Sequence, residues 1–324
     1  MTPPLLALDG LVKHFRPRRG LRWHRPRPLR AVDGVSLAVG PSETVAVVGE
    51  SGCGKSTLAR LALRLLDPDA GSIRLDGHEI AGVTQSDLRP IRRRIQAVFQ
   101  DPAASLNPRL RIVDLIGEPI RNYEAIRRPA LRERVAGLLG DVGLDAEHLD
   151  RFPHEISGGQ RQRIGIARAL ALDPALLVLD EAVSALDVSI QAQILNLLMD
   201  LQDERRIAYL FIAHDLSVVE HFADRVAVMY LGRIVETAPV ADLFAGALHP
   251  YTEALLAAAP TPDPARSGLT RRRLLKGDPP SPSAIPSGCR FRTRCPIAQP
   301  LCAERDPALL PVDDTRAVAC HLRP

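Results

Sequence analysis

The feature that most constrains the fold is a glycine-rich stretch, GESGCGKS, at Gly49–Ser56. It fits the pattern G-x-x-x-x-G-K-[ST] and follows a short β-branched run, TVAVV, at Thr44–Val48. The residues after it, LARLALRLL, have the apolar spacing of a helix. A strand, a glycine loop and a helix in this order form a phosphate-binding loop, because glycines let backbone N–H groups curl round a phosphate without side-chain clashes. The chain is therefore predicted to be an α/β protein that binds a nucleoside triphosphate.

Each part of this loop has a predicted role. Lys55 is expected to reach the β- and γ-phosphates, and Ser56 to offer its hydroxyl to Mg²⁺. The N-terminus of the following helix adds roughly +0.5 elementary charge at the same place. Cys53 has no partner cysteine nearby and is interpreted as a small space-filling residue. The predicted nucleotide contacts in this region are Gly49, Glu50, Ser51, Gly52, Cys53, Gly54, Lys55, Ser56 and Thr57.

Polar residues that follow other apolar runs complete the expected site. The run Leu176–Leu179 leads into Asp180 and Glu181. Asp180 is expected to hold the water shell of Mg²⁺, and Glu181 to polarise a water molecule for in-line attack on the γ-phosphate. Gln100, after IQAVF, is a candidate ligand for Mg²⁺ and water, and His214, after YLFIA, is a candidate contact to the γ-phosphate. Taken alone, Gln100 or His214 is more often an ordinary polar residue at a strand end.

A second glycine-led helix start lies in HEISGGQRQRIGIARAL at His154–Leu170. Ser157 is suited to cap this helix, and Gly158, Gly159 and Gln160 would leave backbone N–H groups open to an anion. One nucleotide needs only one such cradle. We therefore expect the second cradle to contact a nucleotide held by another subunit, with two copies arranged head to tail. The alternative is an ordinary capped helix.

The order GESGCGKS, Gln100, ISGGQ, LLVLDE, SALD and His214 resembles the nucleotide-binding subunit of an ABC transporter. The resemblance covers residues 5 to about 245 and implies the ABC-type fold of P-loop NTPases, with a helical signature subdomain at about 101–170. It also implies ATP hydrolysis with Mg²⁺.

The same resemblance implies roles for residues outside the phosphate loop. Phe15 is the best match to the aromatic residue that stacks on adenine in the family, and Trp23 is a second candidate. Asp187, in SALD, corresponds to the loop that contacts the partner's site. The leucine that usually precedes SGGQ is Ile156 here, a conservative change between apolar residues.

Longer stretches narrow the resemblance. QDPAASLNPRL, VMYLGRIVE, HPYTEALL and GDPPSP followed by PSGCRFRTRCP are similar to the ATPases of oligopeptide, dipeptide and nickel importers. The insertion between Phe15 and Ala31 fits the second of their two ATPase subunits, the F type. The resemblance implies a related ATPase partner, two transmembrane permease subunits and an extracytoplasmic substrate-binding protein. It places the chain on the cytoplasmic face of the membrane and leaves the cargo open between peptides, nickel and other small solutes.

The C-terminal part differs in composition, with prolines and arginines dominating after His249. We therefore expect an ATPase domain at 1–245 and an extension at 246–324. Four of the five cysteines lie in the extension, at Cys289, Cys295, Cys302 and Cys320, with x5, x6 and x17 spacings. Disulfides are not expected in a reducing cytoplasm, and the spacing lacks the C-x2-C pairs of structural zinc sites. The resemblance implies a [4Fe–4S] cluster; zinc and free thiols stay as alternatives.

Charge and hydropathy exclude other classes. The formal net charge is +4, yet the run Arg16–Arg30 alone holds seven arginines, and the rest of the chain is slightly acidic. No broad nucleic-acid surface is expected. The arginine-rich run is interpreted as a solvated loop, with proximity to anionic lipid as the alternative. No apolar stretch approaches the roughly 18 residues of a membrane helix, and no secretory signal is visible, so a cytoplasmic protein is expected.

Two other functions fit the phosphate loop. A soluble ABC ATPase that acts on nucleic acid or ribosomes usually has two cassettes or a long coiled-coil insertion, and this chain shows neither. A P-loop kinase would leave SGGQ and His214 without a purpose.

Overall fold

The computed structural model describes residues 3–16, 28–100, 106–184, 186–258 and 277–323. The chain divides into two compact units. The first comprises Met1–Val39, Thr44–Gly82 and Ile212–Pro324, and the second comprises Gly40–Glu43 and Val83–Phe211. Within the described ranges, no helix combines the length and the apolar character needed to cross a membrane.

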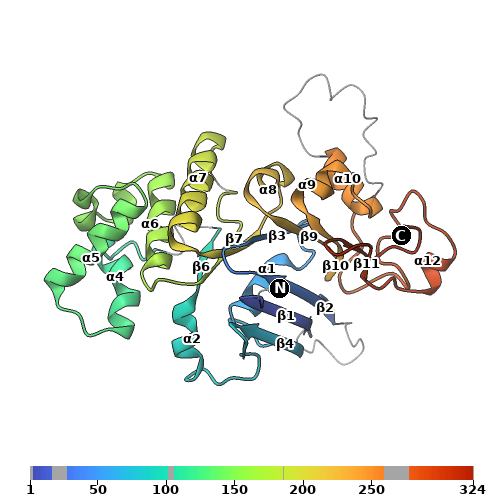
Figure 1. Cartoon of the computed structure of the whole chain (residues 1–324), viewed down its shortest axis with the longest axis horizontal. Coiled ribbons are helices and arrows are strands. Elements are labelled where there is room, and N and C mark those ends of the chain that lie inside the picture. Colours follow the sequence, from blue (N-terminus) through green and yellow to red (C-terminus); the bar gives the residue numbers. More distant parts are fainter. Residues whose placement is uncertain (1–2, 17–27, 101–105, 185, 259–276, 324) are drawn as a thin grey trace, which may run out of the picture. The chain divides into compact units, whose positions relative to one another are not determined.

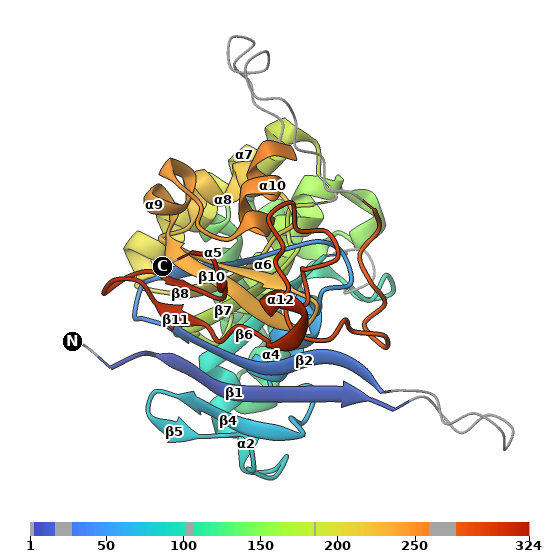
Figure 2. The same cartoon turned by 90° about the vertical axis from the view of Figure 1, so that its right-hand side faces the viewer.

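The first unit contains an antiparallel sheet with the strand order β2-β1-β4-β5 (Figure 2). Its strands are β1 (Leu6–Phe15), β2 (Leu29–Val39), β4 (Ala70–Leu75) and β5 (His78–Glu79). The register runs from Leu6 opposite Val39 to Phe15 opposite Leu29. Leu6, Leu8 and Leu11 of β1 are buried, and a shift of register between Leu8 and Leu11 interrupts the alternation of side chains along the strand.

The same unit contains a second run of strands, in the order β3-β9-β10-β12-β11. They are β3 (Thr44–Val48), β9 (Arg225–Tyr230), β10 (Arg233–Pro239), β12 (Ala317–Val318) and β11 (Leu310–Pro311). β3 and β9 are parallel, and β3 is buried along its whole length, which is typical of a strand covered on both faces. β12 pairs with β10, with Val318 opposite Glu236, so the end of the chain extends this sheet. The helices of the unit are α1 (Lys55–Ala62), α8 (Leu216–Phe222), α9 (Val240–Ala245), α10 (Pro250–Ala258) and α12 (Leu301–Glu304).

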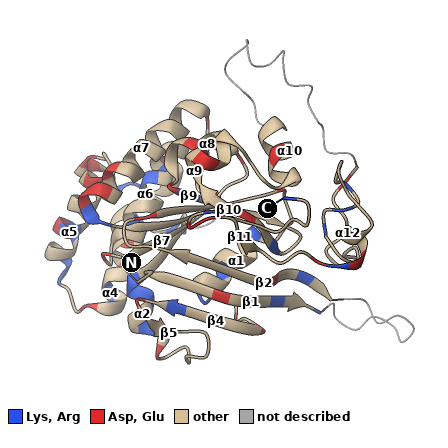
Figure 3. Ribbon diagram, turned by 45° about the vertical axis from the view of Figure 1, so that its right-hand side comes forward, with Lys and Arg blue, Asp and Glu red and all other residues tan. Residues whose placement is uncertain are grey.

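The second unit combines the parallel pair β6 (Ile95–Phe99) and β7 (Leu176–Asp180) with β8 (Ala208–Ile212) and a group of helices. The helices are α2 (Leu88–Arg94), α4 (Ile112–Tyr123), α5 (Arg128–Asp141), α6 (Gly158–Leu170) and α7 (Val188–Arg205), with 3-10 turns η1 (Ala146–Asp150) and η2 (Pro153–Glu155). α4, α5 and α6 pack against one another (Figure 1). α4 and α5 carry charges of both signs, whereas the charged residues of α6 are all arginines (Figure 3).

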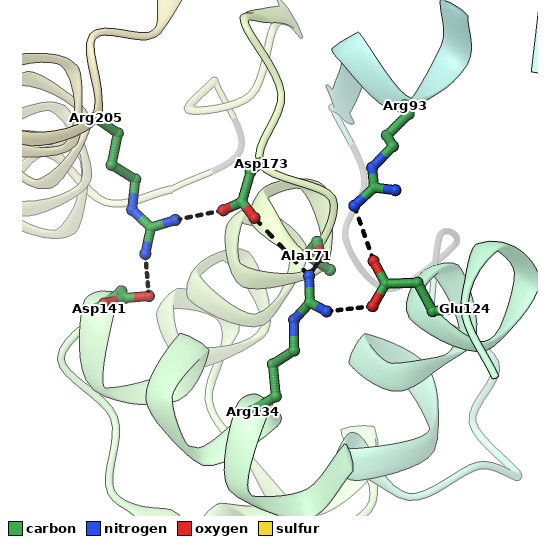
Figure 4. A network of polar contacts seen from close by, with 7 residues as sticks. All are labelled: Arg93, Glu124, Arg134, Asp141, Ala171, Asp173 and Arg205. Atoms are coloured by element: carbon green, nitrogen blue, oxygen red, sulfur yellow. Dashed lines mark hydrogen bonds and ion pairs between the residues drawn. The ribbon is translucent and has the colours of Figure 1, made fainter. Parts of the chain in front are cut away.

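A network of ion pairs connects these helices (Figure 4). Glu124, just after α4, accepts hydrogen bonds from Arg93 of α2 at 2.8 Å and from Arg134 of α5 at 2.6 Å. Arg134 also donates to the carbonyl of Ala171 just after α6, at 3.1 Å. Arg205 of α7 pairs with Asp141 and Asp173. The network therefore links α6 to the helices on either side of it.

The predicted elements are largely confirmed. The strands expected at 44–48 and 95–99 have these bounds in the structure. The helix expected at 55–66 ends at Ala62, because Arg64 turns to φ +52° and the N–H groups of Leu65 and Leu66 bond back to Arg60. The first two strands, which the sequence predicts at 5–11 and 35–39, are longer in the structure: the first reaches Phe15 and the second begins at Leu29.

Candidate functional site

The glycine loop connects β3 to α1, as predicted, and its glycines have separate physical reasons. A Cβ on Gly49, where φ is +153°, would lie 2.1 Å from the carbonyl oxygen of Met229. A Cβ on Gly54, where φ is +116°, would lie 2.0 Å from the carbonyl oxygen of Ala31. Gly52 has free space around it but a φ of +77°, which favours glycine. Backbone atoms of β9 and β2 thus lie so close to the loop that a side chain at Gly49 or Gly54 would change its curvature.

Lys55 lies inside this curve and is 4% exposed. Its Nζ donates hydrogen bonds to the carbonyl oxygens of Gly49 at 2.7 Å and Glu50 at 3.1 Å. α1 begins at Lys55 and has no acidic residue in its first turn, so nothing on the helix offsets its positive end. An ammonium group and a helix N-terminus in one cradle suit a polyphosphate. Burial raises the pKa of the Cys53 thiol, which fits the space-filling interpretation.

His214 lies against the start of the glycine loop. The preceding residue, Ala213, donates its N–H to Val47 of β3 at 3.1 Å. His214 is exposed and lines a cavity of about 300 Å³ together with Gly49 and Leu255 of α10. The first unit alone therefore brings the histidine and the phosphate loop together, as expected for a contact to a terminal phosphate.

Phe15 is the last residue of β1 and is 39% exposed, so its ring is open to stacking. It pairs with Leu29 of β2, the strand whose Ala31 carbonyl touches Gly54 of the loop. Lys13 Nζ lies 5.9 Å from the centroid of the Phe15 ring. The second adenine-stacking candidate, Trp23, lies outside the described residues.

The acidic pair and Gln100 belong to the second unit. Asp180 closes β7 and is 8% exposed, and Glu181 has a φ of +50°. Such a backbone angle is uncommon for a residue with a side chain and is often found at functional sites. The Glu181 carbonyl accepts hydrogen bonds from the Ser184 N–H and Oγ. Phe99 pairs with Asp180, so Gln100 and Glu181 leave two neighbouring parallel strands at the same edge.

The serine–glycine turn is a well-formed helix cap. Ser157 Oγ accepts the N–H of Gln160 at 3.3 Å, and Gln160 Oε1 accepts the N–H of Ser157 at 3.0 Å. A Cβ on Gly159 would lie 2.8 Å from Cγ2 of Ile190 in α7, whereas a Cβ on Gly158 would meet no atom within 4 Å. The predicted cap of this helix by Ser157 is therefore confirmed. Gly159 is explained by packing within the chain, whereas no contact in the described chain requires Gly158.

The loop before α7, which contains the predicted partner contact Asp187, is followed by an apolar residue that is exposed. Asp187 is exposed and precedes α7, and Gln191 donates its N–H to the Asp187 carbonyl at 2.8 Å. The next residue, Val188, is 84% exposed. Ala185, in the same predicted contact loop, lies outside the described residues.

Two residues of the site were not found from the sequence. Tyr251 Oη accepts the N–H of Glu50 at 2.8 Å, and Arg294 donates two hydrogen bonds to the Glu50 carboxylate. Tyr251 stands in HPYTEALL and Arg294 in PSGCRFRTRCP, stretches that the sequence connects only with family resemblance. A contact across 244 positions leaves no local pattern that could have shown it.

The four late cysteines form no disulfide and share one neighbourhood. The Cys289 N–H donates to the Cys302 carbonyl at 2.8 Å. Burial, with the nearby Cys302, Cys295 and Cys320, raises the pKa of Cys289 to about 11. Across the ranges that the structure describes, no group of three or more His, Cys, Asp or Glu side chains is arranged to hold a single metal ion. The iron–sulfur and zinc predictions thus gain no direct support.

Comparison with family models gives two matches. Residues 32–184 match the family described as ABC transporter, and residues 235–302 match the C-terminal region of the oligopeptide/dipeptide transporter. These ranges contain, respectively, the glycine loop with the serine–glycine turn, and Tyr251 with the first three late cysteines.

Curated relatives are similar over almost the whole chain. A probable peptide ABC transporter ATP-binding protein of Sinorhizobium fredii, y4tS, is 56% identical and covers 100% of this chain and 91% of its own. The oligopeptide transport ATP-binding protein AppF of Bacillus subtilis is 48% identical over 98% of this chain and 97% of its own. OppF of Escherichia coli, also an oligopeptide transport ATP-binding protein, is 51% identical over 94% and 92%.

Solved structures agree with these matches. The dimeric post-hydrolysis structure of the ATP-binding cassette MJ0796 with ADP and Pi has a TM-score of 0.64 and 27% identity, over 72% of this chain and 98% of that one. CbiO1 of Clostridium perfringens, part of the transporter complex cbiONQ, has a TM-score of 0.65 and 27% identity, over 75% and 92%.

Proposed function

The chain belongs to the ATP-binding subunits of oligopeptide ABC transporters, and from this premise we propose that it hydrolyses Mg-ATP to energise peptide import across the cytoplasmic membrane. The observation that carries the proposal is the buried Lys55 inside a glycine loop whose curve is fixed by close backbone contacts. Peptide cargo rests on the relatives and on the match of residues 235–302 to the C-terminal region of oligopeptide/dipeptide transporters.

In the proposed reaction, Lys55 and the loop N–H groups bind the β- and γ-phosphates, and Phe15 stacks on the adenine. The residues that would hold Mg²⁺ are Ser56, Gln100 and Asp180, and the metal would supply charge neutralisation at the phosphates. Glu181 orients a water molecule for in-line attack and accepts its proton. His214 hydrogen-bonds the γ-phosphate as negative charge moves onto the leaving oxygen.

We further propose that a second ATPase subunit completes each site, with SGGQ and Asp187 of one chain facing the nucleotide of the other. The open surroundings of Gly158 and the exposure of Val188 support such a contact. A hydrophobic side chain that is 84% exposed beside the predicted contact loop gains by burial against a partner. The related cassette MJ0796 is described as dimeric. For this chain the proposed partner is a related but different ATPase.

The other proposed partners are two permease subunits and an extracytoplasmic substrate-binding protein. They would place the chain on the cytoplasmic face of the membrane. The helical part at about 101–170 would receive the permease, and the division into an ATPase domain at 1–245 and an extension at 246–324 stays a prediction.

For the extension we propose a [4Fe–4S] cluster held by Cys289, Cys295, Cys302 and Cys320, with zinc as the alternative. The donor set suits it, because four free thiols within electrostatic reach of one another can each supply a thiolate. Anaerobic purification should then give iron, sulfide and an absorption band near 400 nm. A colourless protein that contains one zinc ion would reject the cluster and support the zinc alternative.

The function is tested by Glu181→Gln, with Glu133→Gln on the exposed surface of α5 as the matched control. Glu181→Gln should slow ATP hydrolysis about 10²- to 10⁴-fold while ATP still binds, because only the base is lost. Hydrolysis is measured as phosphate release by the assembled transporter, and binding by a fluorescent ATP analogue. Normal turnover in Glu181→Gln would remove this residue from its role, and failure of the wild-type chain to bind ATP would reject the function.

A further inference from the structure

Glu50, the second residue of the glycine loop, has its polar groups held from three directions. Its N–H donates to Tyr251 Oη at 2.8 Å, and its carbonyl accepts Lys55 Nζ at 3.1 Å. Its two carboxylate oxygens accept hydrogen bonds from Arg294, at 2.7 Å from Nη1 and 2.9 Å from Nη2. Two parallel hydrogen bonds between a guanidinium and a carboxylate fix orientation as well as distance. The loop is therefore tied at this residue to two points of the region after residue 250.

Arg294 is well placed to act as a rigid anchor. Its side chain is 5% exposed, against 26% for that of Glu50. Arg294 also donates its backbone N–H to the carbonyl of Phe291 at 2.9 Å, which closes a tight turn. Phe291 is 1% exposed, and its ring centroid lies 5.4 Å from those of Tyr230 and Tyr251. The turn is thus packed onto the same tyrosine that holds the Glu50 N–H.

A second arginine fastens this turn to the rest of the first unit. Arg290 is 5% exposed and donates hydrogen bonds to the Leu231 carbonyl, just after β9, and to the Asp33 carboxylate in β2. The turn from Cys289 to Cys295 therefore contains two buried arginines. Arg290 bonds to β2 and to the residue after β9, and Arg294 bonds to the phosphate loop. Any change in the position of the turn is transmitted to Glu50 through short, charged contacts.

Charge explains why the contact matters for a nucleotide. A carboxylate in a loop that receives a triphosphate adds negative charge where negative charge must bind. Arg294 neutralises this carboxylate and keeps it in a fixed direction. Without the guanidinium, Glu50 would repel the phosphates and its side chain would be free to move.

We propose that Arg294 is a positioning residue for ATP binding, through which the cysteine-containing turn sets the affinity of the glycine loop for nucleotide. This inference rests on the proposed function and adds a regulatory connection to it. Because such coupling is reciprocal, a bound nucleotide must also stabilise the turn.

The first test measures the Kd of a fluorescent ATP analogue with Mg²⁺ on the full-length chain. Arg294→Gln should raise the Kd about tenfold, the effect of losing one charge-assisted contact pair, and Arg294→Lys should give a smaller rise because charge remains without the paired geometry. The matched control is Arg323→Gln, which removes the 2.7 Å pair with Glu253 in the same C-terminal region without touching the loop. This control should leave the Kd unchanged.

A double-mutant cycle separates positioning from general stability. Glu50→Gln should lower the cost of Arg294→Gln to near zero, because the repelling carboxylate is already gone. Additive effects of the two changes, or an unchanged Kd in both Arg294→Lys and Arg294→Gln, would overturn the proposal. An equal effect of Arg323→Gln would also overturn it, by assigning the loss to the extension as a whole.

The second test reads the reverse direction of the coupling. Hydrogen exchange at residues 289–295 should slow when Mg-ATP is added to the wild-type chain, and this protection should be absent in Glu50→Gln. Equal protection in both chains would contradict the inference. Since wild-type ATP binding is measured in the same experiment, failure of the proposed function shows as no binding at all, and failure of this inference as binding without protection.

Discussion

The buried His249 should make the free energy of unfolding depend on pH, by an amount that can be worked out from the structure. Its side chain is 2% exposed, and its Nδ1 accepts the N–H of Tyr251 at 3.0 Å, so that this nitrogen must be unprotonated. The backbone N–H of His249 donates to Glu236 Oε2 at 2.9 Å, and the His249 ring centroid lies 5.7 Å from that of Phe291. Burial lowers the pKa of His249 to about 4 from 6.5.

The sign of the effect follows from proton linkage. Because the pKa is lower in the folded chain than in the unfolded chain, the stabilisation from neutral His249 is fully present above pH 6.5 and is lost as the pH falls towards 4. The full loss is about 3 kcal/mol, and about 2 kcal/mol is lost by pH 5. Hydrogen bonds from Arg290 and His14 outweigh burial and hold the pKa of Asp33 at about 2, so this carboxylate does not titrate in that window.

The assay is urea unfolding followed by circular dichroism at pH 7.5, 6 and 5, on the wild-type chain, His249→Gln and His78→Gln. The His249→Gln chain cannot gain a proton, so its free energy of unfolding should fall by about 2 kcal/mol less than that of the wild type between pH 7.5 and 5. His78 in β5 is exposed, and its substitution should leave the wild-type slope intact. The same pH dependence of the free energy of unfolding in all three chains would refute the argument that burial of His249 controls stability between pH 7.5 and 5.

Four further substitutions have expected outcomes. Gly49→Ala should raise the Kd for ATP about 5- to 100-fold, since its Cβ would lie 2.1 Å from the Met229 carbonyl oxygen; Gly52→Ala, with open space around it, should cost less in the same binding assay. Gly158→Arg should leave the melting temperature unchanged but abolish ATP-dependent association with the partner ATPase in size-exclusion chromatography, and an intact complex would argue for a helix cap alone. Glu124→Gln should lower the free energy of unfolding by about 1–2 kcal/mol through the loss of two arginine contacts, and an unchanged urea midpoint would show the network to be unimportant.

Local patterns predicted much of this molecule. The β-branched run before the glycine loop gives β3 its bounds, and the capping residues Ser157 and Gln160 give the start of α6. The ends of the predicted strands also indicated where Asp180 and Gln100 would lie, because polar residues at the carboxyl ends of parallel strands lie at the same edge of the sheet. Each of these signals depends on neighbours in the sequence.

Long-range contacts had no such signal. The pairing of β12 with β10 and the contacts of Glu50 with Tyr251 and Arg294 depend on how distant segments pack. The backbone angle of Glu181 was equally hidden, because a glutamate with φ +50° looks in sequence like any other acid after a strand. What the sequence left out is thus the three-dimensional support around the phosphate-binding residues.

The pairing of Val318 with Glu236 has a consequence for biosynthesis. β10 is complete well before the ribosome reaches the codons for β12, so its outer backbone edge stays open while the residues between the two strands are synthesised. An open strand edge is a template for contacts between nascent chains. A premature stop codon near residue 310 should therefore yield inclusion bodies rather than a shortened, soluble ATPase.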